Sequence, residues 1–241
     1  MPERKTLVTI VCFNTERELK SVLEKFDTSG QEYEVLIVND GSTDRTKEII
    51  NQFNFRVIEH QINRGVGAAI KTGIDYAIKN NYDNFIIMAG NGKDNPMEIP
   101  RLLNAINAEG YDYVQGSRFS TGGSSDNLPP FRFIMVKVHA LLFSLLTLKR
   151  CTDALNGFRG YRLESFSNPK LNIWQDWLDR YELEMYLHYK FLTNRFKFKE
   201  VPVSKTYPQN WKKVKYSHIR PFVDWWSIMR PLFLLTLRIK K

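Results

Sequence analysis

Residues 7–13 read Leu-Val-Thr-Ile-Val-Cys-Phe, a short apolar run whose one polar member is a β-branched threonine. The polar residues 14–17, Asn-Thr-Glu-Arg, follow it directly. A run this short that meets a polar stretch at once predicts a buried β-strand rather than a secretory signal peptide.

Similar runs recur along the first ninety residues and alternate with amphipathic stretches of helical length. This alternation is typical of βαβ units, which build a mostly parallel sheet with helices on its faces. The sequence therefore predicts an α/β fold, in which ligands bind beyond the carboxyl ends of the strands. The predicted strands are residues 7–13, 33–39, 55–60 and 84–88, and the predicted helices are residues 16–26, 45–53 and 66–80.

Composition limits the classes of partner. The chain has 241 residues, of which 43% are hydrophobic, so one globular domain can bury a full core. A formal net charge of +9 favours an anionic partner: nucleic acid, an acidic membrane surface or a phosphate-bearing small molecule. Cys12 and Cys151 are too few and too far apart for a disulfide framework or a metal cage, which indicates a reducing, cytosolic setting.

Two glycine-containing loops follow predicted strands. Residues 39–44 read Asn-Asp-Gly-Ser-Thr-Asp, where glycine permits a tight turn and the polar residues can cap the next helix. Residues 63–69 read Asn-Arg-Gly-Val-Gly-Ala-Ala, where small residues let the backbone approach a ligand at a helix N-terminus. Each loop is also compatible with an ordinary structural turn, so neither identifies a function alone.

Five ordered motifs are specific when taken together. They are Val-Cys-Phe-Asn at 11–14, the loops at 39–44 and 63–69, Gly-Ser-Arg-Phe at 116–119, and Thr-Asp-Ala-Leu-Asn-Gly-Phe-Arg at 152–159. This order resembles the family-two glycosyltransferases of the GT-A fold, and within them the polyprenyl-phosphate or dolichol-phosphate mannosyl- and glucosyltransferase branch. The resemblance covers roughly residues 6–205 and implies a Rossmann-like, mostly parallel sheet flanked by helices.

The resemblance also implies roles for individual residues. Asp40 matches the acidic residue that recognises the nucleotide of a nucleotide-sugar donor, although Asn39 stands where relatives carry a second aspartate. Arg118, Arg132 and Arg159 match basic positions associated with donor or acceptor phosphates, and a planar guanidinium binds phosphate oxygens in pairs. An ordinary surface salt bridge is the alternative for each arginine. The remaining residues assigned to donor binding are Phe13, Asn14, Gly41, Ser42, Arg64, Gly65, Gly67, Gly90 and Asn91.

The metal motif departs from the family pattern. Relatives carry Asp-X-Asp after the fourth strand to hold Mg²⁺ or Mn²⁺ against the donor diphosphate, but residues 89–91 read Ala-Gly-Asn here. Alanine cannot bind a metal, and Asn91 offers only a neutral carbonyl oxygen. Asp94 lies close by in the sequence, yet one carboxylate and one amide are a thin ligand set for a hard cation. The divalent-metal cofactor is therefore in doubt, with Asn91 and Asp94 as its candidate ligands.

Lys93 follows the altered triplet by two residues. We hypothesise that its ammonium supplies the positive charge that relatives obtain from a metal. Two carboxylates with a divalent ion carry no net charge, whereas a neutral triplet with one lysine carries about one positive charge, so the exchange is electrostatically permitted. A solvated loop lysine is the alternative.

The acceptor decides whether a catalytic base is needed. A lipid phosphate is ionised at pH 7 and can attack the anomeric carbon unaided, so positioning and charge stabilisation by Lys93 and the three arginines would suffice. Family analogy implies inversion at that carbon. A sugar hydroxyl needs a carboxylate base, for which Asp153, Glu182 and Glu184 are the candidates. Solvent exposure on a helix is the alternative for the two glutamates.

Two apolar segments are predicted to lie at a membrane surface. Residues 129–148 form an apolar helix interrupted by three basic residues, and residues 221–239 carry tryptophans and leucines but are broken by charges and a proline. Covering the core of the domain is the alternative for either helix. Residues 195–220 hold eight Lys or Arg against one acidic residue, which places positive charge beside the second segment.

These segments suggest a division into a catalytic domain, residues 1–205, and a basic, aromatic-rich, membrane-associating C-terminal segment, residues 206–241. Residues 215–218 read Lys-Tyr-Ser-His where relatives carry an arginine-glycine-serine-lysine loop, which weakens the expectation that this loop binds the acceptor phosphate. Basic residues with interleaved aromatics also suit single-stranded nucleic acid. The α/β half has no recognisable nucleic-acid module, however, and no nucleic-acid partner is predicted.

The sequence thus predicts an inverting glycosyltransferase that moves a sugar from a nucleotide-sugar donor to a polyprenyl phosphate of the undecaprenyl or dolichyl type. It would act while bound peripherally to the cytoplasmic face of a membrane. One alternative is transfer to a sugar or lipid-linked glycan in polysaccharide assembly. Another is a catalytically degenerate binding subunit of a glycan-assembly complex. The base and sugar of the donor, a membrane-protein partner and homo-oligomer formation are left open.

Overall fold

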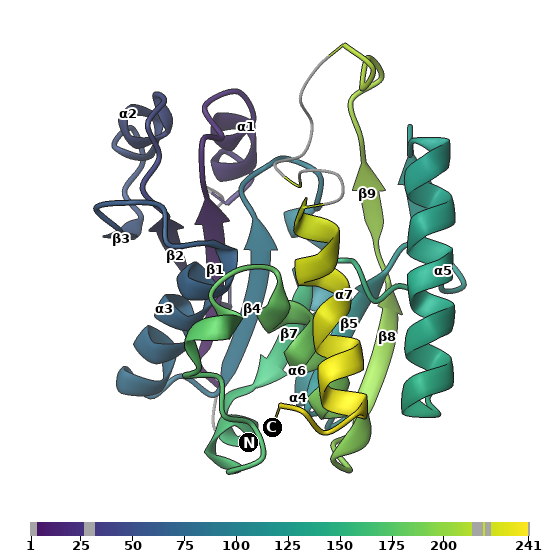
Figure 1. Ribbon diagram of the computed structural model, residues 1–241. Helices are drawn as coiled ribbons and strands as arrows, with labels where there is room; N and C mark the ends of the chain where they lie inside the picture. The colour runs from purple at the N-terminus through teal and green to yellow at the C-terminus, as the bar shows by residue number, and fades with distance from the viewer. Residues whose placement is uncertain (1–3, 27–31, 214–218, 220–222, 241) are drawn as a thin grey trace.

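The computed structural model describes residues 4–26, 32–213, 219 and 223–240. Within them, a seven-stranded sheet has the order β3-β2-β1-β4-β7-β5-β8, and two short strands, β6 and β9, form a second sheet (Figure 1). The strands are β1 (Thr6–Cys12), β2 (Glu34–Asn39), β3 (Arg56–Glu59), β4 (Asn84–Ala89), β5 (Tyr113–Ser117), β6 (Ser124–Asp126), β7 (Arg159–Arg162), β8 (Phe198–Pro202) and β9 (Ser204–Thr206). The α-helices are α1 (Leu19–Leu23), α2 (Thr46–Ile50), α3 (Val66–Lys79), α4 (Ile99–Asn107), α5 (Pro130–Thr147), α6 (Glu182–Thr193) and α7 (Val223–Thr236). Short 3-10 helices cover Pro96–Glu98, Leu163–Ser167 and Asp176–Leu178.

The N-terminal half of the large sheet is parallel because helices cross over between its strands. β1 pairs in parallel with β2 and β4, and β2 pairs in parallel with β3. β7 runs antiparallel between β4 and β5, whereas β8 is parallel to β5. The mostly parallel sheet with flanking helices confirms the predicted α/β class.

Alternate strand residues face two separate apolar layers. Val8 and Ile10 of β1 pack with buried residues of α1, α2 and α4. Leu7 packs in the opposite layer, with buried residues of α3, α6 and α7. Because successive strand side chains point to opposite faces and both faces are covered, the strands must be apolar nearly throughout. This explains why residues 7–13 form an almost uninterrupted apolar run.

The predicted strands and the helix α3 agree with the structure to within one residue at each end. The two predicted helices at 16–26 and 45–53 are instead reduced to α1 and α2. Before α1, Thr15 N donates to Thr46 Oγ1 and Glu16 N donates to Asp44 Oδ2, so these residues are bonded to the segment that follows β2. Helix α1 begins at Leu19.

The C-terminal segment is part of the same folded body. Helix α7 packs beside α6 (Figure 1), and its Leu232 is fully buried. Tyr207 is only 1% exposed, although it follows the predicted boundary after residue 205. Apolar side chains on both sides of position 205/206 thus pack into buried clusters, and the membrane-associating role of residues 206–241 stays a prediction. The predicted loop at 215–218 lies outside the described residues.

Candidate active site

A cleft of about 1000 Å³ opens at the carboxyl ends of β1, β2 and β4. This is the edge at which ligands bind in parallel α/β sheets. The predicted site residues that line it are Phe13, Asn14, Asp40, Gly65, Asn91, Lys93, Asp94, Arg118 and Arg132. The predicted site residues outside its lining are Gly41, Ser42, Arg64, Gly67, Gly90, Asp153 and Arg159.

The Asp40 carboxylate holds the loop that precedes α3. Oδ1 accepts a hydrogen bond from Arg64 N, and Oδ2 accepts from Gly65 N and from Asn63 Nδ2, each at 2.9 Å. His60 Nδ1 also lies 2.7 Å from Oδ1. Asp40 is 1% exposed and therefore fixes the shape of this end of the cleft through its own chain. Direct contact between Asp40 and a nucleotide stays a prediction.

The glycines beside this loop are required by packing within the chain. A Cβ atom at Gly67 would lie 2.1 Å from Leu178 O, and one at Gly65 would lie 2.4 Å from the next carbonyl oxygen of the same segment. A Cβ atom at Gly41, where φ is +67°, would lie 2.4 Å from the backbone of Ile62. The backbone that comes close at Gly67 is thus that of another part of the protein, and contact of Gly67 with a donor stays a prediction.

Side chains of two loops join at the rim of the cleft. Asn14 N donates to Ser42 Oγ at 3.0 Å, and Asn14 Oδ1 accepts from Thr43 N at 2.8 Å. Ser42 N in turn donates to Asn39 Oδ1 at 3.1 Å. The predicted donor-binding residue Ser42 therefore connects the first two strand ends, and the side chain of Arg64 is exposed outside the cleft.

The loop after β4 is held in place by close packing and hydrogen bonds. At Gly90 a Cβ atom would lie 2.6 Å from Cys12 Sγ, so this position excludes a side chain. Asn91 Oδ1 accepts a hydrogen bond from Lys93 N at 3.3 Å. Lys93 O accepts from Thr206 N at 3.1 Å, which ties the loop to β9. The altered triplet thus belongs to a well-bonded structure.

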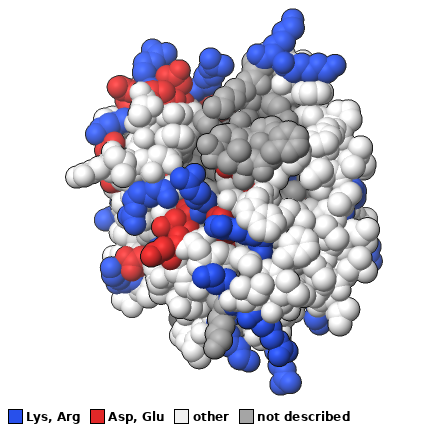
Figure 2. Space-filling model, viewed as in Figure 1, with Lys and Arg blue, Asp and Glu red and all other residues white. Residues whose placement is uncertain are grey.

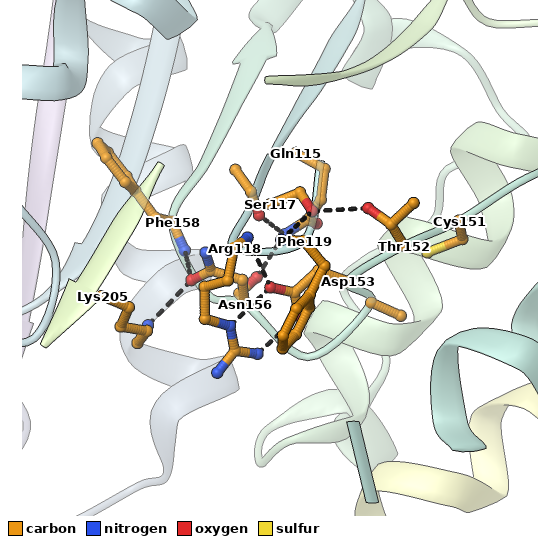
Figure 3. A network of polar contacts seen from close by, with 12 residues as sticks. Gln115, Ser117, Arg118, Phe119, Cys151, Thr152, Asp153, Asn156, Phe158 and Lys205 are labelled. Atoms are coloured by element: carbon orange, nitrogen blue, oxygen red, sulfur yellow. Dashed lines mark hydrogen bonds and ion pairs between the residues drawn. The ribbon is translucent and has the colours of Figure 1, made fainter. Parts of the chain in front are cut away.

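Asp94 is held by a lysine rather than placed beside further carboxylates. Its Oδ1 accepts from Lys205 Nζ at 2.7 Å. Lys205 Nζ also donates to Asn156 Oδ1 at 2.9 Å (Figure 3). Within the described residues, no group of three His, Cys, Asp or Glu side chains is placed to hold a metal ion. With Ala89 and Asn91 nearby, the residues present do not fit a hard-cation site, which needs several oxygen ligands.

Arg118 and Asp153 form a buried ion pair at the back of the cleft (Figure 3). Arg118 Nε and Nη2 donate to the two Asp153 oxygens at 2.7 and 2.6 Å, while Nη1 donates to Tyr207 Oη at 2.6 Å. Burial alone would lower the pKa of Arg118, but the Asp153 carboxylate outweighs it and raises that pKa. Because Asp153 is fully buried behind Arg118, its geometry does not suit the base role considered for it.

Arg159 lies in the core instead of the cleft. Its guanidinium donates to three backbone carbonyl oxygens, those of Ala154, Asn156 and Glu184. The side chain is fully buried. These bonds join the loop before β7 to helix α6, so Arg159 supports the cleft from behind, and the structure does not place it where a bound phosphate would contact it.

Lys93 and Arg132 approach the same aromatic ring. Lys93 Nζ and Arg132 Cζ each lie 5.7 Å from the centroid of Tyr207. Lys93 is 8% exposed, and burial, followed by the charges of Lys205 and Arg132, lowers its pKa to about 7. The alternative of a solvated loop lysine does not agree with this position. The cleft therefore contains a group of closely spaced cationic side chains.

The two glutamates of α6 are separated by the structure. Glu184 lines the cleft, and its Oε1 lies 3.0 Å from the Cβ position that a side chain at Gly157 would have. Glu182 is 1% exposed and forms an ion pair with Arg230 of α7. Only Glu184 is thus placed to act on a group in the cleft.

Sequence reasoning missed Lys205 and the structural role of Tyr207. Both stand on or beside β9, a strand of three residues that no periodic pattern marks. Their position follows from the antiparallel bridge between Asp94 and Lys205, which joins segments more than a hundred residues apart. In the sequence, the short basic stretch that contains Lys205 and Tyr207 indicated only a concentration of positive charge.

A mostly parallel sheet with a cleft lined by cationic side chains at its strand ends is the architecture of a GT-A glycosyltransferase. The profile of the family described as "Glycosyl transferase family 2" matches residues 7–168. The chain therefore belongs to glycosyl transferase family 2, and it is a glycosyltransferase, as its motif order predicts.

Relatives in sequence include the polyprenol monophosphomannose synthase of Mycolicibacterium smegmatis, 28% identical over 85% of this chain and 78% of that protein. The dolichol-phosphate mannosyltransferase of Pyrococcus furiosus is 28% identical over 70% of this chain and 49% of its own length. The undecaprenyl-phosphate mannosyltransferase of Micrococcus luteus is 27% identical over 67% of this chain and 68% of its own length.

A solved structure with the same fold is the glucosyl-3-phosphoglycerate synthase of Mycobacterium tuberculosis in complex with Mg²⁺ and uridine diphosphate. Its TM-score is 0.71 at 16% identity, and the similarity covers 99% of this chain and 81% of that one. The likeness confirms the predicted GT-A architecture.

Proposed function

We propose that this protein transfers a sugar from a nucleotide-sugar donor to a polyprenyl phosphate at a membrane surface, with inversion at the anomeric carbon. The names of the sequence relatives support the acceptor class. The observation that carries the proposal is the placement of α5, which joins the cleft to an exposed apolar surface.

Helix α5 presents different groups on different sides. Arg132, in its first turn, lines the cleft and lies beside Tyr207. The outer side of the helix shows an apolar stripe at intervals of three and four residues, which places its members on one helical face. This outer stripe consists of Phe131, Ile134, Val138, Leu141 and Leu145, each between 46% and 60% exposed.

The surroundings of the outer stripe suit an anionic lipid surface. The side of the molecule on which α5 lies is mostly uncharged in Figure 2. The exposed cations Lys137, Lys149 and Arg150 flank the stripe, as headgroup contacts require. In the part of the chain that the structure describes, only α5 is long and apolar enough to cross a membrane, and 28% of it is buried. The proposal is that α5 lies on the membrane, with Arg132 facing inward.

This geometry suits a phosphate that is delivered by a lipid. An ionised phosphate oxygen of the acceptor forms the new bond to the anomeric carbon while the bond from that carbon to the donor diphosphate breaks. The nucleoside diphosphate leaves with the electron pair, and no proton has to be removed from the nucleophile. Arg132 would hold the acceptor phosphate, and the cations near Tyr207 would balance the charge that gathers during transfer.

The test is transfer of radiolabelled hexose from GDP- and UDP-linked donors to undecaprenyl or dolichyl phosphate in vesicles of phosphatidylcholine and phosphatidylglycerol. A labelled lipid product that yields an α-configured hexose from a β-linked donor, or the reverse, is expected. Transfer to soluble sugars only, or donor binding with no transfer to any acceptor, would contradict the proposal.

The membrane part is tested separately by vesicle flotation. Leu141→Glu places a charge in the outer stripe and is expected to reduce vesicle binding at least about tenfold, because burying a charged side chain in the interface opposes insertion. Ile78→Glu is the matched control, since Ile78 is 45% exposed on α3. Equal flotation of both variants would show that the outer stripe does not bind lipid.

A second candidate function is transfer to a sugar hydroxyl of a lipid-linked glycan. The observation that favours it is Glu184, whose carboxylate lines the cleft and would serve as the base that such an acceptor needs. The same assay with lipid-linked glycans as acceptors distinguishes the two functions.

A further inference from the structure

The loop after β4 carries Lys93 where the family pattern has metal ligands, and the structure surrounds it with further cations. Lys205 is 9% exposed and reaches the same cleft from β9. Arg132 approaches from α5, and the ring of Tyr207 lies 5.7 Å from both Lys93 Nζ and Arg132 Cζ. Three separate elements thus bring basic side chains to one end of the cleft.

Two of the oxygens that could bind a metal in this loop are engaged by the chain itself, whereas Asp94 Oδ2 is buried and accepts no hydrogen bond from the residues that the structure describes. Asn91 Oδ1 accepts from the backbone of Lys93, and Asp94 Oδ1 accepts from Lys205 Nζ. Asp94 therefore acts as a positioning residue for an ammonium. A divalent ion bound at Asp94 Oδ2 would lie close to the Lys205 ammonium on Oδ1 of the same carboxylate, and the two positive groups would repel each other.

We propose that Lys93 and Lys205 bind the diphosphate of the donor directly, so that nucleotide binding requires no divalent metal. This inference rests on the proposed function, because it specifies how the same cleft binds the nucleotide-sugar donor. An ammonium is a suitable point charge for phosphate oxygens, and its attraction is stronger in a partly desolvated cleft than in water.

The contacts of Lys205 show how the site is preorganised. Its ammonium has three N–H donors, of which one bonds to Asp94 and one to Asn156. These bonds fix the ammonium at the cleft wall before a ligand arrives, which lowers the entropic cost of binding. Lys93 is fixed in a similar way, because its own carbonyl accepts from Thr206 N and its stem is buried.

The proposal is tested by calorimetric titration of the full chain with GDP and with UDP, in EDTA and in Mg²⁺ or Mn²⁺. The dissociation constant is expected to change less than about threefold between these conditions. Lys93→Met, which keeps the buried stem without the charge, is expected to weaken nucleotide binding in EDTA at least about tenfold, which corresponds to about 1.4 kcal/mol. Lys79→Met is the matched control, because Lys79 lies exposed on α3 and pairs with Asp75.

A second variant tests whether a divalent metal can replace the positive charge of Lys93. The triple change A89D/N91D/K93M restores two carboxylates and removes the ammonium, while Gly90 is left in place because Cys12 excludes a side chain there. Nucleotide binding by this variant is expected to become dependent on Mg²⁺ or Mn²⁺. Thermal unfolding of each variant confirms that it folds.

The outcomes separate this proposal from the proposed function. Binding by the wild-type chain that EDTA abolishes and Mg²⁺ restores, or that Lys93→Met leaves unchanged, overturns the lysine proposal while transfer to polyprenyl phosphate can still be observed. Metal-independent binding without transfer supports the lysine proposal and overturns the proposed function. Failure of both nucleotides to bind in all conditions overturns both.

Discussion

Arg118 and Asp153 form a doubly hydrogen-bonded ion pair in which both side chains are buried, with N–O distances of 2.7 and 2.6 Å. The Glu200 carboxylate accepts hydrogen bonds from the backbone N–H groups of Thr152 and Asp153 and from the Thr152 hydroxyl. The pair thus connects the end of β5 to the loop before β7 and fixes one wall of the cleft. A motif residue predicted to contact phosphate is therefore also part of the protein's internal framework.

Replacing Asp153 with Asn should destabilise the protein strongly, because it leaves the Arg118 guanidinium buried with an uncompensated charge. The expected loss in the free energy of unfolding is about 3 to 5 kcal/mol, measured by urea denaturation. Asp75→Asn breaks the exposed pair with Lys79 and should cost no more than about 0.5 kcal/mol. Similar losses for both variants would contradict this assignment.

Replacing Gly67 with Ala should shift the start of α3 away from the segment at Leu178, because the new Cβ would meet its carbonyl oxygen at 2.1 Å. Overpacking of this kind costs about 1 to 3 kcal/mol, and a backbone neighbour places the expected loss at the upper end. At Gly110, with φ of +76°, no atom lies within 4 Å, so Gly110→Ala should show only backbone strain of about 1 kcal/mol. In urea denaturation, Gly67→Ala should therefore lose more free energy of unfolding than Gly110→Ala.

The buried His139 of α5 should make stability sensitive to acid. Burial lowers the pKa of His139 to about 4, below its ordinary value of 6.5, so the unfolded chain binds more protons between these values. The stabilising contribution is complete above pH 6.5 and is lost as the pH falls toward 4. At pH 5 the loss amounts to about 2 kcal/mol.

Comparison of the wild type with His139→Phe isolates this effect. The drop in the free energy of unfolding between pH 7 and pH 5 should be about 2 kcal/mol smaller in the variant. Burial, followed by the charges of Arg159 and His139, also lowers the pKa of the buried His188, so the same comparison made in a His188→Phe background removes its contribution. Parallel pH profiles would show that His139 titrates normally in the folded protein.

Replacing Arg132 with Ala should impair use of the lipid phosphate more than binding of the nucleotide. The expected loss in kcat/KM for polyprenyl phosphate is about a hundredfold, since a charge-assisted contact to the acceptor is removed. The GDP or UDP dissociation constant, measured by calorimetry, should change less than about threefold. Arg132→Lys should recover part of the activity, and an equal loss in both measurements would place Arg132 at the donor instead.

Replacing Glu184 with Gln distinguishes the two candidate acceptors. If the nucleophile is an ionised phosphate, kcat should fall less than about threefold, because no base is required. If it is a sugar hydroxyl, kcat should fall about a hundredfold to ten-thousandfold. Steady-state rates with each acceptor decide the question, and thermal unfolding checks that the variant folds.

The sequence by itself determined the parallel half of the sheet, because β1 and β4 are buried on both faces and each is an apolar run of strand length. Thr6–Cys12 and Val66–Lys79 appear within one residue of their predicted bounds. It also determined the family, since five motifs in a fixed order carry more information than any one loop. The sequence also showed that the family's metal ligands are absent at residues 89–91 and that Lys93 stands close by.

Only the tertiary structure decided which basic residues reach the cleft. Arg159 and Arg132 look alike in the sequence, yet three backbone carbonyls hold Arg159 in the core while Arg132 lines the cleft. Lys205 joins the loop after β4 only because Asp94 pairs with it across a long sequence separation. Periodicity reports which face of an element is buried, but contacts between distant segments depend on how the elements pack, and they set the chemistry of this site.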